Sequence, residues 1–82
     1  MPKISVIEEA DGIEKYLKKR QLLKQYLKAK NNILAGRLQQ AAFRKRNPKS
    51  SNCYYFRIND QFRAIGYFEG EILVITAIDN HQ

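Results

Sequence analysis

Two arginines in the last third of the chain have the residue type and spacing to bind an anion. Arg57 and Arg63 lie in the runs YYFRI and FRAIGYF, which residues 59–61 separate. A three-residue loop there keeps the apolar residues of the two runs together and puts Arg57 directly opposite Arg63. Like charges at opposite positions destabilise a sheet, and a phosphate between the two guanidinium forks would offset that cost. Alternatively, both side chains reach past the sheet edge to solvent or to Asp60 and Asp79.

The other candidate groups are one histidine and a basic segment. His81 is the only histidine of the chain. A solvated histidine is usually inert, but an imidazole beside a bound phosphate can transfer a proton near neutral pH. The segment FRKRNPKSSN, residues 43–52, reads as a basic loop because proline, asparagine and serine favour turns. The sequence has no P-loop, no dinucleotide-binding glycine pattern, no HExxH and no Cys/His metal spacing.

The layout of charge points to an anionic partner. The net charge is +7, and every charged residue between Lys15 and Asn59 is a lysine or an arginine. Such a segment cannot form internal i,i+4 ion pairs. Nucleic acid or an acidic protein would neutralise it, and a surface selected only for solubility is the third possibility.

Length and composition predict one soluble domain spanning residues 1–82. A chain of 82 residues with 44% hydrophobic and 28% charged residues is typical of a small globular protein. No apolar run approaches the roughly 20 residues of a membrane helix. The N-terminal stretch MPKISVIEEADG has no long apolar core, so we expect no secretory signal. The single cysteine, Cys53, cannot form an internal disulfide, and we expect a cytoplasmic protein.

The first half of the chain predicts a strand and a helical hairpin. Residues 3–7 alternate polar and apolar side chains, as a short strand does. Asp11 and Glu14 have the spacing of a capping box. The phase of the apolar residues changes after Gln21, so two helices, at about 12–20 and 22–35, describe the pattern better than one. The second should end near Gly36, although Leu38, Ala41, Ala42 and Phe43 could extend it.

The last third predicts an antiparallel meander with strands near 54–58, 62–68 and 72–78. Glu69-Gly70 suits a tight hairpin turn, and Asn59 suits an Asx turn. The strands are apolar on both faces. One face carries Ile65, Tyr67, Ile72, Val74 and Ile78, and the other carries Ala64, Leu73, Ile75 and Ala77. Two helices can cover only one face, so we expect a partner on the other unless part of the sheet simply stays exposed.

The stretch FRINDQFRAIGYFEGEILVITAIDNH resembles the C-terminal half of the RelE/ParE toxin superfamily of bacterial type II toxin–antitoxin pairs. The core RIN-x-x-aromatic-R, the hairpin and the Asp-x-His end are most similar to the HigB and RelE branches. The resemblance is weaker across the helical hairpin and FRKRNPK. It implies a compact α+β domain with an N-terminal strand, a two-helix hairpin and an antiparallel C-terminal β-meander. It also implies a monomeric toxin that forms oligomers with an acidic antitoxin.

The resemblance further implies an mRNA endoribonuclease that acts on the ribosome without metal or cofactor. In such members the ribose 2′-hydroxyl attacks the adjacent phosphate, which gives a cyclic phosphate and a 5′-hydroxyl. By position, Arg57 would contact the scissile phosphate, Arg63 would help to hold it, and His81 would do acid–base work. Lys45, Arg46 and Lys49 would bind the RNA backbone.

Two departures keep other functions open. Nuclease members commonly carry a tyrosine beside the terminal histidine, whereas Asn80 and Gln82 flank His81 here; Tyr55 or Tyr67 could replace it. Strict strand alternation puts His81 and Arg63 on opposite faces unless the chain bends after Ile78. A non-cleaving protein of the same fold is therefore the alternative, either a gyrase poison or a degenerate toxin that binds antitoxin. A small basic nucleic-acid-binding protein would explain the charge but not the two-faced apolar sheet.

Overall fold

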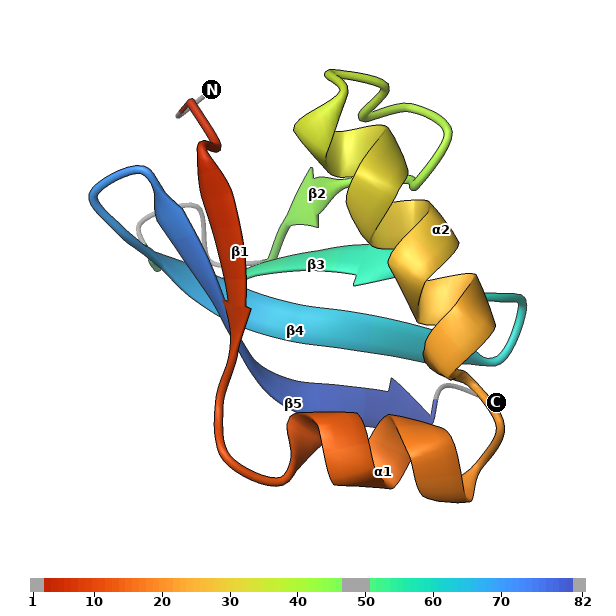
Figure 1. Ribbon diagram of the computed structural model, residues 1–82. Coiled ribbons are helices and arrows are strands. Elements are labelled where there is room, and N and C mark those ends of the chain that lie inside the picture. Colours follow the sequence, from red (N-terminus) through yellow and green to blue (C-terminus); the bar gives the residue numbers. More distant parts are fainter. Residues whose placement is uncertain (1–2, 47–50, 81–82) are drawn as a thin grey trace.

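The described chain folds into one mixed sheet with two helices on one side (Figure 1). The computed structural model describes residues 3–46 and 51–80. In chain order the elements are β1 (Val6–Glu9), α1 (Ile13–Lys19), α2 (Leu23–Leu34), β2 (Arg44–Lys45), β3 (Tyr54–Arg57), β4 (Phe62–Glu69) and β5 (Ile72–Asn80). The strand order is β1-β5-β4-β3-β2, in which β1 runs parallel to β5 and the other pairs are antiparallel. The α+β fold class is confirmed, with β1 starting later than the predicted residues 3–7.

The helical hairpin breaks where the apolar phase changes. Gln21 takes a φ of 59°, in the left-handed region, which ends α1 and redirects the chain into α2. The predicted capping box at Asp11 and Glu14 is wrong. A tight turn closes when the Ile13 N–H donates to the Ala10 carbonyl (3.2 Å), and this makes Gly12 the N-cap, without a side-chain bond.

Helix α2 ends at Leu34, close to the predicted stop near Gly36, and no further helix follows it in the described part of the chain. The N–H groups of Gly36 and Arg37 donate to the carbonyls of Ile33 (3.0 Å) and Asn32 (2.8 Å), which is a Schellman motif. This closure rules out the helical extension considered for residues 38–43. The chain instead turns, with Ala42 at a φ of 51°, and enters the short strand β2, which the sequence did not predict.

The β3–β4 connection has the predicted register. The side-chain oxygen of Asn59 accepts hydrogen bonds from the backbone N–H groups of Gln61 and Phe62, both at 2.8 Å. This Asx turn fixes a three-residue loop, so Arg57 faces Arg63 across the strand pair. The β4–β5 turn is two residues long, as expected, but comprises Gly70 and Glu71.

A β-bulge between β4 and β5 changes which side chains share a face. Ile65 pairs with Ala77, whereas Gly66 pairs with Ile75, so Thr76 is an extra residue on β5. The predicted faces of Ala77 and Ile78 are therefore wrong, because the bulge reverses the alternation after Thr76.

Both helices pack on one face of the sheet, here called the inner face. Its core includes fully buried side chains from both helices, β3 and β5: Leu17, Tyr26, Phe56, Leu73 and Ile75. Within the described residues, no helix lies on the opposite, or outer, face (Figure 1). Neither described helix has the length or the apolar composition needed to span a lipid bilayer.

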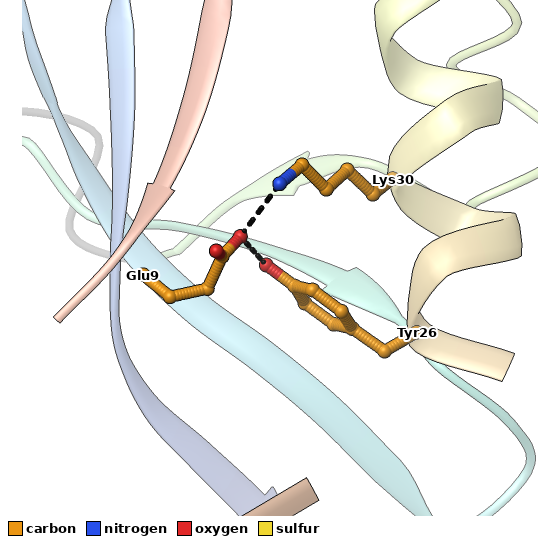
Figure 2. A network of polar contacts seen from close by, with 3 residues as sticks. All are labelled: Glu9, Tyr26 and Lys30. Carbon is orange, nitrogen blue, oxygen red and sulfur yellow. Dashed lines mark hydrogen bonds and ion pairs between the residues drawn. The ribbon is translucent and has the colours of Figure 1, made fainter. Parts of the chain in front are cut away.

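A polar network at the edge of this core ties α2 to β1 (Figure 2). The Tyr26 hydroxyl and the Lys30 ammonium both donate to the Oε2 atom of Glu9, at 2.6 and 2.9 Å. The Tyr26 side chain is almost fully buried. Burial, and then the hydrogen bond and charge of Glu9, raise the pKa of Tyr26 well above its usual value of about 10.

This pKa shift predicts a loss of stability in alkali. In the unfolded chain Tyr26 ionises near pH 10, whereas in the folded chain it stays protonated, so unfolding releases a proton above that pH. The contribution is fully present below about pH 10 and falls by about 1.4 kcal/mol per pH unit above it. Tyr26→Phe should cost about 1–2 kcal/mol at pH 7 and flatten the alkaline decline in urea unfolding. Tyr67→Phe, at an exposed tyrosine, is the control; an alkaline decline unchanged by Tyr26→Phe would contradict the assignment.

Candidate nucleic-acid interface

One half of the outer face is basic because of strand register. Residues that pair across neighbouring strands point to the same side of the sheet. Arg44 pairs with Tyr55. Arg63 pairs with Arg57 on one side and with Asp79 on the other. By alternation Arg46 belongs to the same face, and its N–H donates to the Cys53 carbonyl (2.8 Å). We call this set the basic half of the outer face: Arg44, Arg46, Tyr55, Arg57, Arg63 and Asp79.

A small cavity within the basic half gathers two of its arginines. Arg46, Tyr55, Arg63, Ile65 and Asp79 line a cavity of about 150 Å³. The guanidinium of Arg63 lies 5.1 Å above the centre of the Tyr55 ring, which holds this half-buried arginine by a cation–π contact. The cavity therefore presents two guanidinium forks, a phenol and a carboxylate to one ligand.

Arg57 lies opposite Arg63 along the backbone, but its side chain lines a different cavity. That cavity, of about 340 Å³, lies between α2 and the β3–β4 loop. Arg57 also pairs with Asp60 at 4.0 Å, and the Asp60 side chain is fully exposed, so the pair adds little stability. The two guanidinium groups thus do not share one cavity, and Arg57 follows the predicted alternative of reaching the sheet edge.

The remaining candidate residues are scattered. Lys45 pairs with Tyr54, on the inner side of the sheet edge, and its Nζ lies 5.6 Å from the centre of that ring. Lys49 and His81 lie outside the described residues. Strand β5 continues to Asn80 without the bend considered after Ile78, and the bulge instead brings Asp79 opposite Arg63.

The two candidate tyrosines are equivalent in the sequence but not in the structure. Tyr55 lines the cavity with Arg63, whereas Tyr67 is exposed and contacts Glu69 at 3.5 Å. The sequence did contain a signal for Tyr55: the predicted register puts Arg63 opposite Arg57, and Tyr55, two residues before Arg57, lies on the same face. No pattern in the sequence indicated that Asp79 and Arg46 line one cavity. Among the described residues, no three His, Cys, Asp or Glu side chains gather as metal ligands.

The other half of the outer face is apolar. Val6 and Tyr67 are 45% and 37% exposed, and Ile65, Ile72 and Val74 beside them are half-buried. The prediction of an uncovered apolar face is therefore confirmed for Ile65, Tyr67, Ile72 and Val74. Helix α2 exposes two further leucines, Leu27 and Leu34, one on each side of Lys30.

Solved structures share this arrangement of strands and helices. A chain of the Escherichia coli DinJ–YafQ toxin–antitoxin complex superposes with a TM-score of 0.68, over 92% of this chain and 90% of that one, at 11% identity. The YoeB dimer from Staphylococcus aureus superposes with a TM-score of 0.61, over 93% and 95% of the two chains, at 19% identity. The chain has the RelE-like toxin fold.

The RelE-like fold confirms the resemblance inferred from the sequence, at the level of architecture. No family model and no curated protein sequence matches this chain. At 11–19% identity the likeness concerns the fold alone, so the chemistry has to be argued from this chain's own residues.

Proposed function

We propose that this RelE-like protein is the toxin of a type II toxin–antitoxin pair that inhibits translation by cleaving mRNA on the ribosome without metal. The observation that carries the proposal is the cavity in which Arg46, Arg63 and Tyr55 meet on a sheet face that no helix covers. Its support is the likeness of the fold to a chain of a toxin–antitoxin complex. Such a protein would act in the bacterial cytoplasm, where mRNA is translated.

The basic half suits a phosphodiester that passes through a negatively charged transition state. The forks of Arg46 and Arg63 match phosphate oxygens bidentately and would stabilise the charge that develops when the 2′-oxygen attacks phosphorus. The Tyr55 ring offers a surface on which a base can stack. The 2′-hydroxyl must lose a proton and the leaving 5′-oxygen must gain one. We assign this proton transfer to His81, two residues after Asp79.

The other basic residues would hold the RNA strand. Arg57 would contact a phosphate near the cleavage point from the edge of the sheet. Lys45 and Lys49 would bind the RNA or ribosomal RNA backbone, which carries no sequence information but supplies salt-dependent affinity.

The apolar half of the outer face would bind an acidic antitoxin. A partner segment that covers Val6, Tyr67, Ile72 and Val74 would remove this surface from water. The same segment would reach the adjacent basic half, where acidic side chains would compete with RNA.

A second candidate is a non-cleaving member of the fold, and one observation favours it. Arg57 and Arg63 line separate cavities, so a single phosphate is not clamped by both. A gyrase poison or an antitoxin-binding module would need the fold and the surfaces but not the catalytic arrangement.

Expression of the chain without any partner distinguishes these functions. We expect growth arrest, and primer extension on cellular mRNA should reveal new 5′ ends within translated regions. His81→Ala should abolish these ends, whereas Lys19→Ala, which removes a positive charge from α1, should not. Arrest with a DNA-damage response and intact mRNA would instead support the gyrase poison, and unchanged growth would support an antitoxin-binding module.

A further inference from the structure

The cavity between α2 and the β3–β4 loop is a second polar site, separate from that of Arg46 and Arg63. Its volume is about 340 Å³, which is within the range of small-ligand sites. Only Ala29 and Ile58 among its lining residues are apolar. The other lining residues are polar or charged, and they include Gln25, Lys28, Asn32, Arg57 and Asp60.

The orientation of Gln25 is determined by a chain of obligatory hydrogen bonds. The Asn59 oxygen accepts from two backbone N–H groups, which can only donate. The Asn59 nitrogen therefore points away from them and donates to the Oε1 atom of Gln25 (2.9 Å). This leaves the Nε2 group of Gln25 as the part of its amide that can serve a ligand, and that group is a donor.

Asn32 is oriented in the same way by Arg37. The Nε atom of Arg37 donates to the Oδ1 atom of Asn32 (2.9 Å), and a guanidinium can only donate. The Nδ2 donor of Asn32 is thus left for a ligand. Lys28 and Arg57 add two cationic donors, so donors dominate the cavity, while the exposed Asp60 carboxylate stays near Arg57.

A donor-rich cavity with two cations selects a ligand that is both anionic and rich in acceptors. A nucleotide meets this requirement, since its phosphate suits Lys28 and Arg57 and its base can present carbonyl oxygens to Gln25 and Asn32. Uracil and guanine carry a carbonyl oxygen where cytosine and adenine carry an amino group, itself a donor. An amino group facing these amides would leave donors unpaired, which is the strongest basis for rejecting a ligand.

We infer that this cavity binds one nucleotide of single-stranded RNA and prefers bases with a carbonyl group, uracil and guanine, over the amino bases. The inference rests on the proposed function, because it adds a base-selecting subsite beside the cavity of Arg46 and Arg63. Arg57 lies between the two cavities, since its backbone pairs with that of Arg63 while its side chain lines the cavity beside α2.

The test is the affinity of the whole chain for 2′-O-methyl octauridine and octacytidine, which lack the attacking hydroxyl, measured by fluorescence anisotropy. Octauridine should bind about tenfold more tightly than octacytidine. Gln25→Glu keeps the acceptor for Asn59 but replaces the free donor with an oxygen, so the affinity ratio should fall to about one. Gln39→Glu makes the same charge change outside this cavity and should preserve the ratio.

Lys28 supplies an independent readout. Lys28→Ala should weaken both oligonucleotides equally and lower the salt dependence of binding by about 0.7 in log–log slope, which corresponds to one phosphate contact. Lys24→Ala, one turn away on α2 and outside the cavity, should change neither.

Every outcome bears on the inference, and one of them also bears on the proposed function. Equal affinity for the two oligonucleotides, or a ratio that Gln25→Glu leaves unchanged, overturns the inference and leaves RNA binding intact. Binding of neither overturns the inference and the proposed function together. Octaglutamate that binds as tightly as octauridine, and is weakened equally by Lys28→Ala, would make the cavity a site for acidic peptides and would also overturn the inference.

Discussion

Replacing Arg63 with alanine is expected to lower the rate of mRNA cleavage by about a hundredfold or more, because it removes a preorganised donor to the transition-state phosphate. Arg63 lies over Tyr55 in the cavity that Arg46 and Asp79 also line. Its loss should change the free energy of unfolding by no more than about 1 kcal/mol, which is the size of a single cation–π contact near the protein surface. Cleavage rates in a translating extract and urea unfolding measure the two quantities.

Two controls separate geometry from charge. Arg63→Lys keeps the charge but loses the bidentate fork, so we expect it to recover only part of the rate. Lys19→Ala lowers the net charge equally on the far side of the molecule and should cleave at the normal rate. Full activity in Arg63→Ala would show that the outer-face cavity is not the site of cleavage.

Replacing Gly66 with alanine is expected to destabilise the fold by about 3 kcal/mol, as overpacking of a core does. A Cβ atom at this position would lie 2.3 Å from the Val74 carbonyl oxygen and 3.0 Å from its carbon. Both are backbone atoms, so β4 and β5 would have to move apart at the bulge. Because the bulge brings Asp79 opposite Arg63, the same change should also lower RNA affinity.

A second glycine provides the comparison in urea denaturation. Gly36 has a φ of 84°, and a Cβ atom added there would have no atom of the described residues beyond its own chain neighbours within 4 Å. Gly36→Ala therefore carries backbone strain without a clash, and it should cost about 1 kcal/mol. If Gly66→Ala is no worse than Gly36→Ala, the close approach at the bulge does not constrain the sheet.

The sequence predicts this fold well wherever the signal is local. The phase change after Gln21 separates the helices, and the Asx chemistry of Asn59 sets the β3–β4 register. The bulge at Thr76 is harder to predict, because a glycine inside a strand, here Gly66, is compatible with a bulge but does not say where the extra residue lies on the neighbouring strand. Strand β2 is equally hard to predict, since two basic residues pair only because the β3 edge is there to receive them.

In the candidate site, the sequence predicts the backbone register but not the direction of the side chains. Register alone predicts that Arg57 and Arg63 face each other, and the structure agrees. The direction of a long side chain at a sheet edge is set by what lies beyond the edge, here α2 and the β3–β4 loop, so the separate cavity of Arg57 could not be predicted.

The central claim is that RNA binds the basic half of the outer face. Titration of the ¹⁵N-labelled protein with 2′-O-methyl octauridine, followed by two-dimensional NMR, tests it residue by residue. We expect saturable shifts of the backbone amide signals of Arg46, Tyr55, Arg63 and Asp79. Saturation of binding without any shift at Tyr55, Arg63 and Asp79 would contradict the account.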